Sequence, residues 1–166
     1  DSGYGIDSYT EGHIPNSIFV DVDNDLASEK RPGTGRHPLP DPNTFSEKLS
    51  HWGMSNTKQV VVYDDAGGAF AGRLWWMLKW LGHEAVAVLD GGLNSWVKGG
   101  NKLVTTPTVF EKAYFEPCMQ GNMIATVDDV EEAQFKMNTI LLDARSKERY
   151  QGCLLYTSPS PRDGDE

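Results

Sequence analysis

Residues 60–96 read VVVYDDAGGAFAGRLWWMLKWLGHEAVAVLDGGLNSW, and this stretch decides the fold of the chain. Residues 60–63 form a continuous apolar run that is typical of a buried central strand, and residues 85–89 form a second one. Between them, residues 70–81 carry apolar side chains at helical spacing, and Gly82 is a typical helix stop. Strands that alternate with a helix predict right-handed crossovers in a parallel sheet, so the predicted fold class is α/β.

The loop after the first predicted strand contains Asp64, Asp65, Gly67 and Gly68. In open α/β sheets, ligands bind at the carboxyl ends of strands, beside a loop and a helix N-terminus. The two glycines would let backbone N–H groups point at an anion, but Asp64 places a carboxylate where a nucleophile would lie. We therefore expect Asp64 and Asp65 to cap or brace the loop above the next helix, and we assign no catalytic residue here.

Phosphate chemistry has little support in the same loop. Neither G-x-G-x-x-G nor G-x-x-x-x-G-K-[ST] occurs in residues 64–73. An aspartyl nucleophile at Asp64 would need a metal site and a nearby general acid, and Asp65 alone does not supply them. Neither a nucleotide-binding loop nor phosphoryl transfer is predicted.

Composition and charge restrict the partners. The chain has 166 residues and a formal net charge of −9 with no Lys/Arg cluster, so no nucleic-acid partner is predicted. No apolar run approaches the roughly 20 residues of a membrane span, so no membrane partner is predicted either. Cys118, Cys153 and four dispersed histidines give neither a disulfide framework nor a metal-ligand spacing.

Periodicity and turn residues predict further elements on both sides of the central stretch. These are a strand at residues 17–23, a surface loop at 24–43, a helix that begins with a Thr44–Glu47 capping box and ends before Gly53, a helix from Thr126 through Val130, Ala133 and Met137, and a strand at 139–143.

Tyr9, the run GHIPNS at residues 12–17 and the central stretch at residues 60–96 resemble the non-catalytic N-terminal domain of the tandem rhodaneses. These are the thiosulfate and 3-mercaptopyruvate sulfurtransferases. The family pattern is an aromatic residue, three residues and then His-Ile-Pro-Gly-Ala, and here Asn-Ser replaces the final Gly-Ala. The resemblance, which covers residues 9–152, implies a rhodanese-like doubly wound parallel sheet with helices on both faces, followed by the start of a second domain of the same type.

The same resemblance divides the chain into segments. It implies an N-terminally incomplete, non-catalytic domain at residues 1–103, an interdomain linker at 104–125 and the truncated start of the catalytic domain at 126–152. Residues 153–163, CLLYTSPSPRD, resemble a sequencing-library adapter translated in frame. We therefore expect residues 153–166 to be an adapter-derived tail, with a native Ser/Pro-rich tail as the alternative.

The activity that the resemblance implies is sulfur transfer through a cysteine persulfide. A thiolate in the second domain takes sulfur from a small anionic donor, thiosulfate or 3-mercaptopyruvate, and passes it to cyanide or a thiol, with no cofactor. In active domains this cysteine lies where Asp64 lies here, so the chain as written is expected to be inactive. The expected location is the cytoplasm, or the mitochondrion for a eukaryotic parent. The alternative function is that of a catalytically silent rhodanese-like domain acting as a binding or regulatory module.

Arg149 is the one candidate substrate-binding residue, and Arg145 precedes it by four positions. By resemblance, Arg149 matches an arginine that helps to hold the anionic donor, and Arg145 belongs to the Asp-Ala-Arg end of a strand. A planar guanidinium suits a carboxylate or sulfonate because it donates paired hydrogen bonds. An ordinary surface or interdomain ion pair is the alternative.

Overall fold

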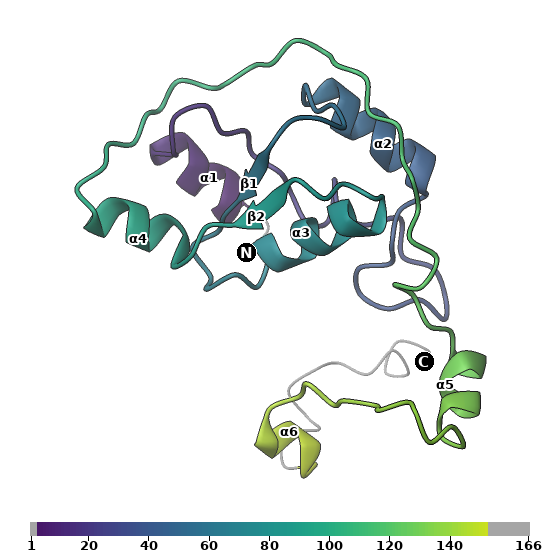
Figure 1. Cartoon of the computed structure of the whole chain (residues 1–166). Coiled ribbons are helices and arrows are strands. Elements are labelled where there is room, and N and C mark those ends of the chain that lie inside the picture. Colours follow the sequence, from purple (N-terminus) through teal and green to yellow (C-terminus); the bar gives the residue numbers. More distant parts are fainter. Residues whose placement is uncertain (1–2, 153–166) are drawn as a thin grey trace. The chain divides into compact units, whose positions relative to one another are not determined.

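The computed structural model describes residues 3–152, and these fall into two compact units that divide between Met123 and Ile124 (Figure 1). The predicted tail at residues 153–166 lies outside the described residues. The first unit contains α1 (Tyr4–Glu11), α2 (Pro42–His51), β1 (Val60–Val62), α3 (Ala71–Trp80), β2 (Val86–Val88) and α4 (Gly92–Lys98). The second unit contains α5 (Val127–Ala133) and α6 (Lys147–Tyr150).

The predicted strand–helix–strand unit is confirmed. β1 and β2 are parallel, in the register Val60–Val86 to Val62–Val88, and α3 is the crossover that packs against both strands. The predicted helix at residues 70–81 corresponds to α3, which ends just before Gly82 takes the left-handed conformation, φ +80°. The fold is thus α/β, with a small parallel sheet and flanking helices.

Two predicted strands are wrong. Residues 17–20 have no helical or turn structure and are not hydrogen-bonded to a neighbouring strand, and the chain then turns where the Asp25 N–H donates to the Asp21 carbonyl at 2.9 Å. Residues 139–143 also lack a strand partner among the described residues. Their β-branched and apolar composition favours extended backbone, but a strand exists only where a second strand accepts its hydrogen bonds.

The helix predicted from Thr44 begins two residues earlier, with a different cap. The Asp41 carboxylate accepts hydrogen bonds from the N–H groups of Asn43 and Thr44, both at 3.0 Å, and Pro42 occupies the first turn. The predicted Thr44–Glu47 capping box is therefore wrong, because Asp41 followed by proline gives a stronger helix start. The helix predicted from Thr126 is present with Thr126 as its cap, but it ends at Ala133 and does not reach Met137.

The core of the first unit lies between α2, α3 and the sheet. Its buried members are large apolar side chains that contact one another: Leu26, Phe45, Leu49, Met54, Met77, Leu78, Trp80, Leu81 and Phe115. Leu78 belongs to α3, and Phe115 comes from the segment after α4. The core is therefore closed by chain that the sequence predicted to be a linker.

Residues 110–120, here called the strap, dock on the C-terminal ends of α2 and α3. The Ala113 N–H donates to the Ser50 carbonyl at 2.9 Å, and the Cys118 N–H donates to the Leu81 carbonyl at 2.9 Å. Phe115 is buried, and its ring meets His83 edge-on with the centroids 5.8 Å apart. The strap thus satisfies helix-end carbonyl groups that would otherwise need water.

Two glycines at helix ends make room for the strap. Gly53 has φ +77°, and a Cβ there would lie 2.5 Å from the Phe110 Cβ. Gly82 has φ +80°, and a Cβ there would collide with the Cys118 carbonyl oxygen. The same residue type that ends each helix therefore lets the backbone of the strap approach it.

We expect Gly82→Ala to destabilise the chain more than Gly100→Ala. Both glycines are left-handed, at φ +80° and +75°, which costs an alanine about 1–2 kcal/mol at either position. Gly100 has open space around it, whereas the new methyl at Gly82 displaces the strap, which adds about 1–3 kcal/mol. Urea unfolding of the two variants measures the difference, and equal losses would contradict the packing role of Gly82.

Candidate functional site

The Asp64 loop, residues 64–71, forms a cradle of backbone N–H groups that is filled by the side chain of Asp64. One carboxylate oxygen, Oδ1, accepts hydrogen bonds from Ala66 N at 3.0 Å and Gly68 N at 2.7 Å. The other, Oδ2, accepts from Phe70 N and Ala71 N, both at 2.8 Å. A single carboxylate therefore uses four donors that converge on one point.

The local sequence explains this geometry. Gly67 and Gly68 take left-handed backbone, φ +71° and +92°, which turns the loop N–H groups inward. Ala71 is the first residue of α3, and the residue before it, Phe70, has no side chain that can cap the helix. The side chain of Asp64, just after β1, therefore caps α3 in place of the N-cap residue Phe70, which follows it by six positions.

The pKa of the Asp64 carboxyl group is lowered from its ordinary value. Partial burial raises this pKa, but the hydrogen bonds from the N–H groups of Ala71, Gly68, Phe70 and Ala66 together lower it by more. The carboxylate therefore stays charged at neutral pH. A second anion in the same cradle would find its donors occupied and would be repelled.

The backbone of Asp64 also fixes α4. Its carbonyl oxygen accepts a hydrogen bond from Leu93 N at 2.9 Å, and a Cβ on Gly92 would collide with that oxygen. Neighbouring Asp65 accepts a hydrogen bond from the Tyr4 hydroxyl at 2.7 Å, which ties α1 to the same loop. The Gly91–Gly92 pair after β2 is thus the start of a helix that rests on the Asp64 loop.

Tyr63 joins the end of β1 to the GHIPNS turn. Its hydroxyl accepts a hydrogen bond from Ile14 N at 3.2 Å and lies 2.7 Å from Ser17 Oγ. Asn16 has φ +63°, so it takes the left-handed conformation that the glycine of the family pattern would take. His13 is buried and stacked on Tyr9 with the centroids 3.8 Å apart, so it holds the turn in place.

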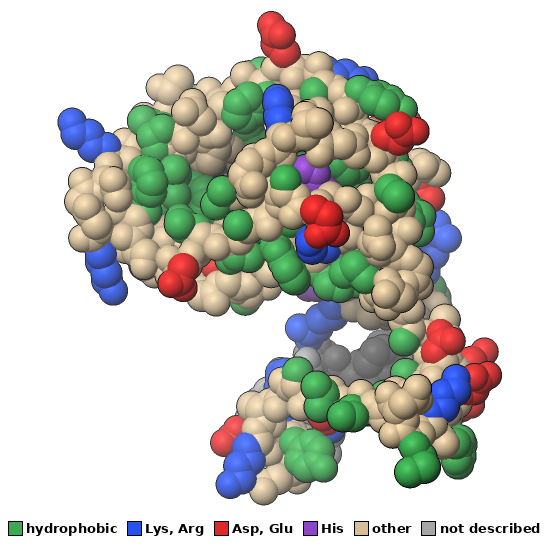
Figure 2. Space-filling view, in the orientation of Figure 1, with side chains coloured by type: hydrophobic (Ala, Val, Ile, Leu, Met, Phe, Trp, Pro, Cys, Tyr) green, Lys and Arg blue, Asp and Glu red, His purple; other side chains and the backbone are tan. Residues whose placement is uncertain are grey.

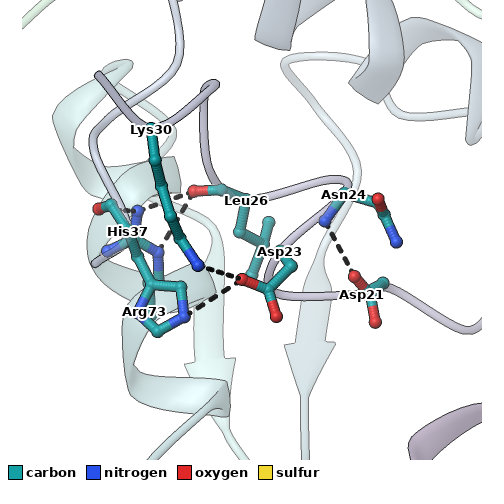
Figure 3. Close-up of polar contacts among 7 residues, drawn as sticks. All are labelled: Asp21, Asp23, Asn24, Leu26, Lys30, His37 and Arg73. Carbon is teal, nitrogen blue, oxygen red and sulfur yellow. Dashed lines mark hydrogen bonds and ion pairs between the residues drawn. The ribbon is translucent and has the colours of Figure 1, made fainter. Parts of the chain in front are cut away.

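Arg73 is the cation closest in sequence to the Asp64 loop, but it holds a different loop (Figure 3). Its guanidinium donates to the Leu26 carbonyl from Nε at 3.1 Å and from Nη2 at 2.7 Å, and also to the His37 carbonyl at 2.9 Å. Beside it, the Asp23 carboxylate pairs with Lys30 at 3.6 Å and with His37 at 3.4 Å. Burial lowers the pKa of Arg73, and its donors are used to anchor residues 24–43 to α3.

The second unit holds Arg145 and Arg149. The Arg145 Nε lies 2.9 Å and 2.8 Å from the two carboxylate oxygens of Asp143, and its guanidinium lies over the Tyr150 ring at 5.7 Å. Hydrogen bonds from Arg145 lower the pKa of Asp143. Arg149 lies in α6, where Ser146 caps its backbone N–H at 3.4 Å, and its side chain is exposed and has no ion pair within the described residues.

Sequence analysis did not identify Tyr63 and Arg73 as positioning residues. Both bind main-chain or hydroxyl groups that are 36 to 49 positions away in the sequence. For metals, residues 3–152 contain no group of three or more His, Cys, Asp or Glu side chains placed to hold an ion. No helix within this range is long and apolar enough to cross a membrane.

A parallel strand–helix–strand unit with a cradle of backbone N–H groups just after β1 is typical of an open α/β fold. The model of the Rhodanese-like domain matches residues 5–99, and the chain belongs to this family.

Among proteins of this family, the chain is similar to several sulfurtransferases. The chain is 40% identical over 154 residues to a probable 3-mercaptopyruvate sulfurtransferase from Pseudomonas aeruginosa, covering 92% of this chain and 54% of that protein. It is 34% identical over 157 residues to rat (Rattus norvegicus) thiosulfate sulfurtransferase, covering 92% and 50%. The solved structure of SseA from Escherichia coli, described as a 3-mercaptopyruvate sulfotransferase, is 30% identical with a TM-score of 0.79, covering 89% and 55%. The chain thus spans about half the length of the curated relatives it matches.

We expect Asp64→Ala to lower the free energy of unfolding by about 2–3 kcal/mol at pH 7, because it removes a cap and leaves several N–H groups without an acceptor. Since the folded pKa of Asp64 is lowered, its contribution is full above the unfolded pKa of about 4 and is lost as the pH falls through the folded pKa. The difference between wild type and variant should therefore shrink below about pH 4.

Urea unfolding between pH 2 and pH 7 measures this difference. Asp90→Ala is the matched control, since Asp90 lies just beyond β2 and is exposed. An Asp64→Ala loss no larger than the Asp90→Ala loss would contradict the role of Asp64.

Proposed function

We propose that this chain is part of a sulfurtransferase that moves sulfane sulfur from thiosulfate or 3-mercaptopyruvate to cyanide or a thiol through a cysteine persulfide. The names of the Pseudomonas aeruginosa and rat relatives support the two donors. In this proposal, residues 1–103 belong to a non-catalytic, N-terminally incomplete domain with a doubly wound sheet. Residues 104–125 connect it to the catalytic domain, and residues 126–152 begin that second domain. The first domain serves as scaffold.

The occupied cradle is the observation that supports the scaffold role of the first domain. Sulfur transfer needs a soft nucleophile that holds a second sulfur atom, and a carboxylate cannot do this. Four N–H groups that could stabilise a persulfide in an active domain are used by Asp64. The reactive thiolate of the protein therefore lies outside the Asp64 loop, and this loop contributes rigidity instead of chemistry.

The second candidate function is a catalytically silent module that binds or regulates another protein. The same occupied cradle favours it, as does the place of the one cysteine in the described part of the chain. Cys118 is exposed on the strap, its N–H is bonded to the Leu81 carbonyl, and no cradle of N–H groups surrounds its sulfur. The presence or absence of a persulfide-forming cysteine in the full-length parent separates the two candidates.

The test is persulfide formation on thiosulfate addition. We expect intact-mass spectrometry to show no added sulfur atom on this chain and one added sulfur on the full-length parent, removable by cyanide. Cys118→Ser is the control that identifies any adduct on the strap. A stable sulfur adduct on Cys118 would refute the scaffold assignment, and a parent that takes up no sulfur would favour the silent module.

Arg149 is proposed to bind the anionic donor in the parent enzyme. Its exposed guanidinium can offer paired hydrogen bonds to a carboxylate or sulfonate. We expect Arg149→Ala in the parent to raise KM for thiosulfate about tenfold or more, with partial rescue by Arg149→Lys, because lysine keeps the charge and loses the paired geometry. Steady-state kinetics measure the change in KM, and Lys147→Ala in the same short helix is the control. Equal effects of the two alanine variants would mean that Arg149 contributes only surface charge.

A further inference from the structure

His83 is a buried titratable residue whose side chain has no polar partner. It follows Gly82 just after α3 and is 1% exposed, and neither Nδ1 nor Nε2 of its ring has a hydrogen-bond partner within the described residues. His13 is equally buried but differs, because its Nδ1 lies 2.8 Å from the Tyr9 carbonyl oxygen and its Nε2 lies 3.2 Å from the Thr106 carbonyl oxygen. Buried polar groups are nearly always paired, so the unpaired ring of His83 needs a physical explanation.

The strap is in direct contact with the His83 ring. The Phe115 ring, itself buried, meets the imidazole edge-on with the centroids 5.8 Å apart. Besides the bond from Cys118 described above, Gln120 N donates to the Trp80 carbonyl at 2.8 Å, so the strap is fixed to the last turn of α3. Moving the strap away would therefore remove Phe115 from the ring and expose the imidazole to water.

No charged group near His83 is paired with its ring. The titratable residues on the surrounding elements are Lys79 and Glu84 on its own side of the strap, Glu111, Lys112, Tyr114, Glu116 and Cys118 on the strap itself, and His51 at the end of α2. Glu84 is paired with Lys79, and Glu116 is exposed. Acidic side chains are scattered over the face of the first unit that Figure 2 shows, without a cluster. An imidazolium at His83 would thus be buried without a counter-ion.

Burial without a partner makes the docked strap sensitive to acid. A buried charge that is neither paired nor hydrogen-bonded is far more costly than a buried neutral ring. An exposed histidine has a pKa of about 6.5, so a ring uncovered by the strap binds a proton below that pH. Docking of the strap is therefore fully favoured above about pH 6.5, and its equilibrium constant falls about tenfold for each pH unit below it.

We infer that His83 and the strap form an acid-sensitive latch, in which the strap is docked at neutral pH and protonation of His83 releases it. The strap lies just before the second unit in the sequence. Its release lengthens the free segment that joins the two units, so proton binding at one side chain changes the reach of the connection. This inference does not depend on sulfur chemistry.

The experiment is amide hydrogen exchange on the full chain, with rates corrected for the intrinsic effect of pH. We expect the protection factors of the Cys118 and Gln120 amides to fall about tenfold between about pH 7.5 and about pH 5.5. The Leu89 amide, which donates to the Val62 carbonyl in the sheet, is the internal reference and should keep its protection. Unchanged strap protection overturns the latch, and an equal fall at Leu89 means that the whole unit opens, which overturns the strap as the moving element.

Two neutral variants identify the group that binds the proton. His83→Gln and His83→Leu should each make strap protection the same at the two pH values, because neither side chain titrates. His51→Gln is the matched control, since His51 is exposed at the end of α2, and it should keep the tenfold fall. A His83 variant that keeps the fall, or a His51 variant that loses it, overturns the role of His83.

The ring of His83 in the wild-type chain gives a readout that needs no substitution. Its Cε1 resonance, followed by nuclear magnetic resonance, should report proton uptake over the same pH range in which the strap amides lose protection. A ring that takes up a proton while the strap amides stay protected overturns the latch.

Discussion

The arrangement of the first unit depends on the carboxylate of Asp64 and the backbone N–H groups around it. The side chain caps α3 and closes the loop through Gly68, while the carbonyl of the same residue holds α4 through Leu93. Three elements therefore meet at one residue at the end of β1. Because the carboxylate is charged and partly shielded, each of its hydrogen bonds is stronger than a bond between neutral groups, and the loop has one favoured conformation.

The same geometry leaves the N–H groups of the loop no free donor for a second anion. A ring of inward N–H groups at a helix N-terminus stabilises whatever negative charge lies at its centre. When that charge is a carboxylate fixed to the backbone, the ring serves only to stabilise the fold. A thiolate at the same position would leave the donors for a transferable sulfur atom. One side chain at the end of the strand thus decides between a structural cap and a reactive centre.

The strand–helix–strand unit could be predicted from sequence because apolar periodicity and Gly82 are local signals. The bracing role of Asp64 could be predicted because an aspartate before a glycine-rich loop and a helix start is a typical cap. The pairing of strands depends on residues far apart in the sequence. The strand predicted at residues 17–23 is therefore wrong, although the composition of this segment is typical of a strand. The anchors made by Tyr63 and Arg73 could not be predicted, since their partners are a main-chain N–H, carbonyls and a hydroxyl that no side-chain pattern marks.

The small sheet raises the question of how the first unit is held together. Two short strands bury little apolar surface by themselves, and an isolated pair of strands is marginally stable. The core instead lies mainly between α2 and α3, where Leu49 and Leu78 are fully buried, and Phe115 of the strap closes it. Since the strap binds helix-end carbonyls and fills the space left by two glycines, it belongs to the packing of the first unit more than to a free connection. The packing of the first unit is therefore completed by the strap on the helical side of the sheet.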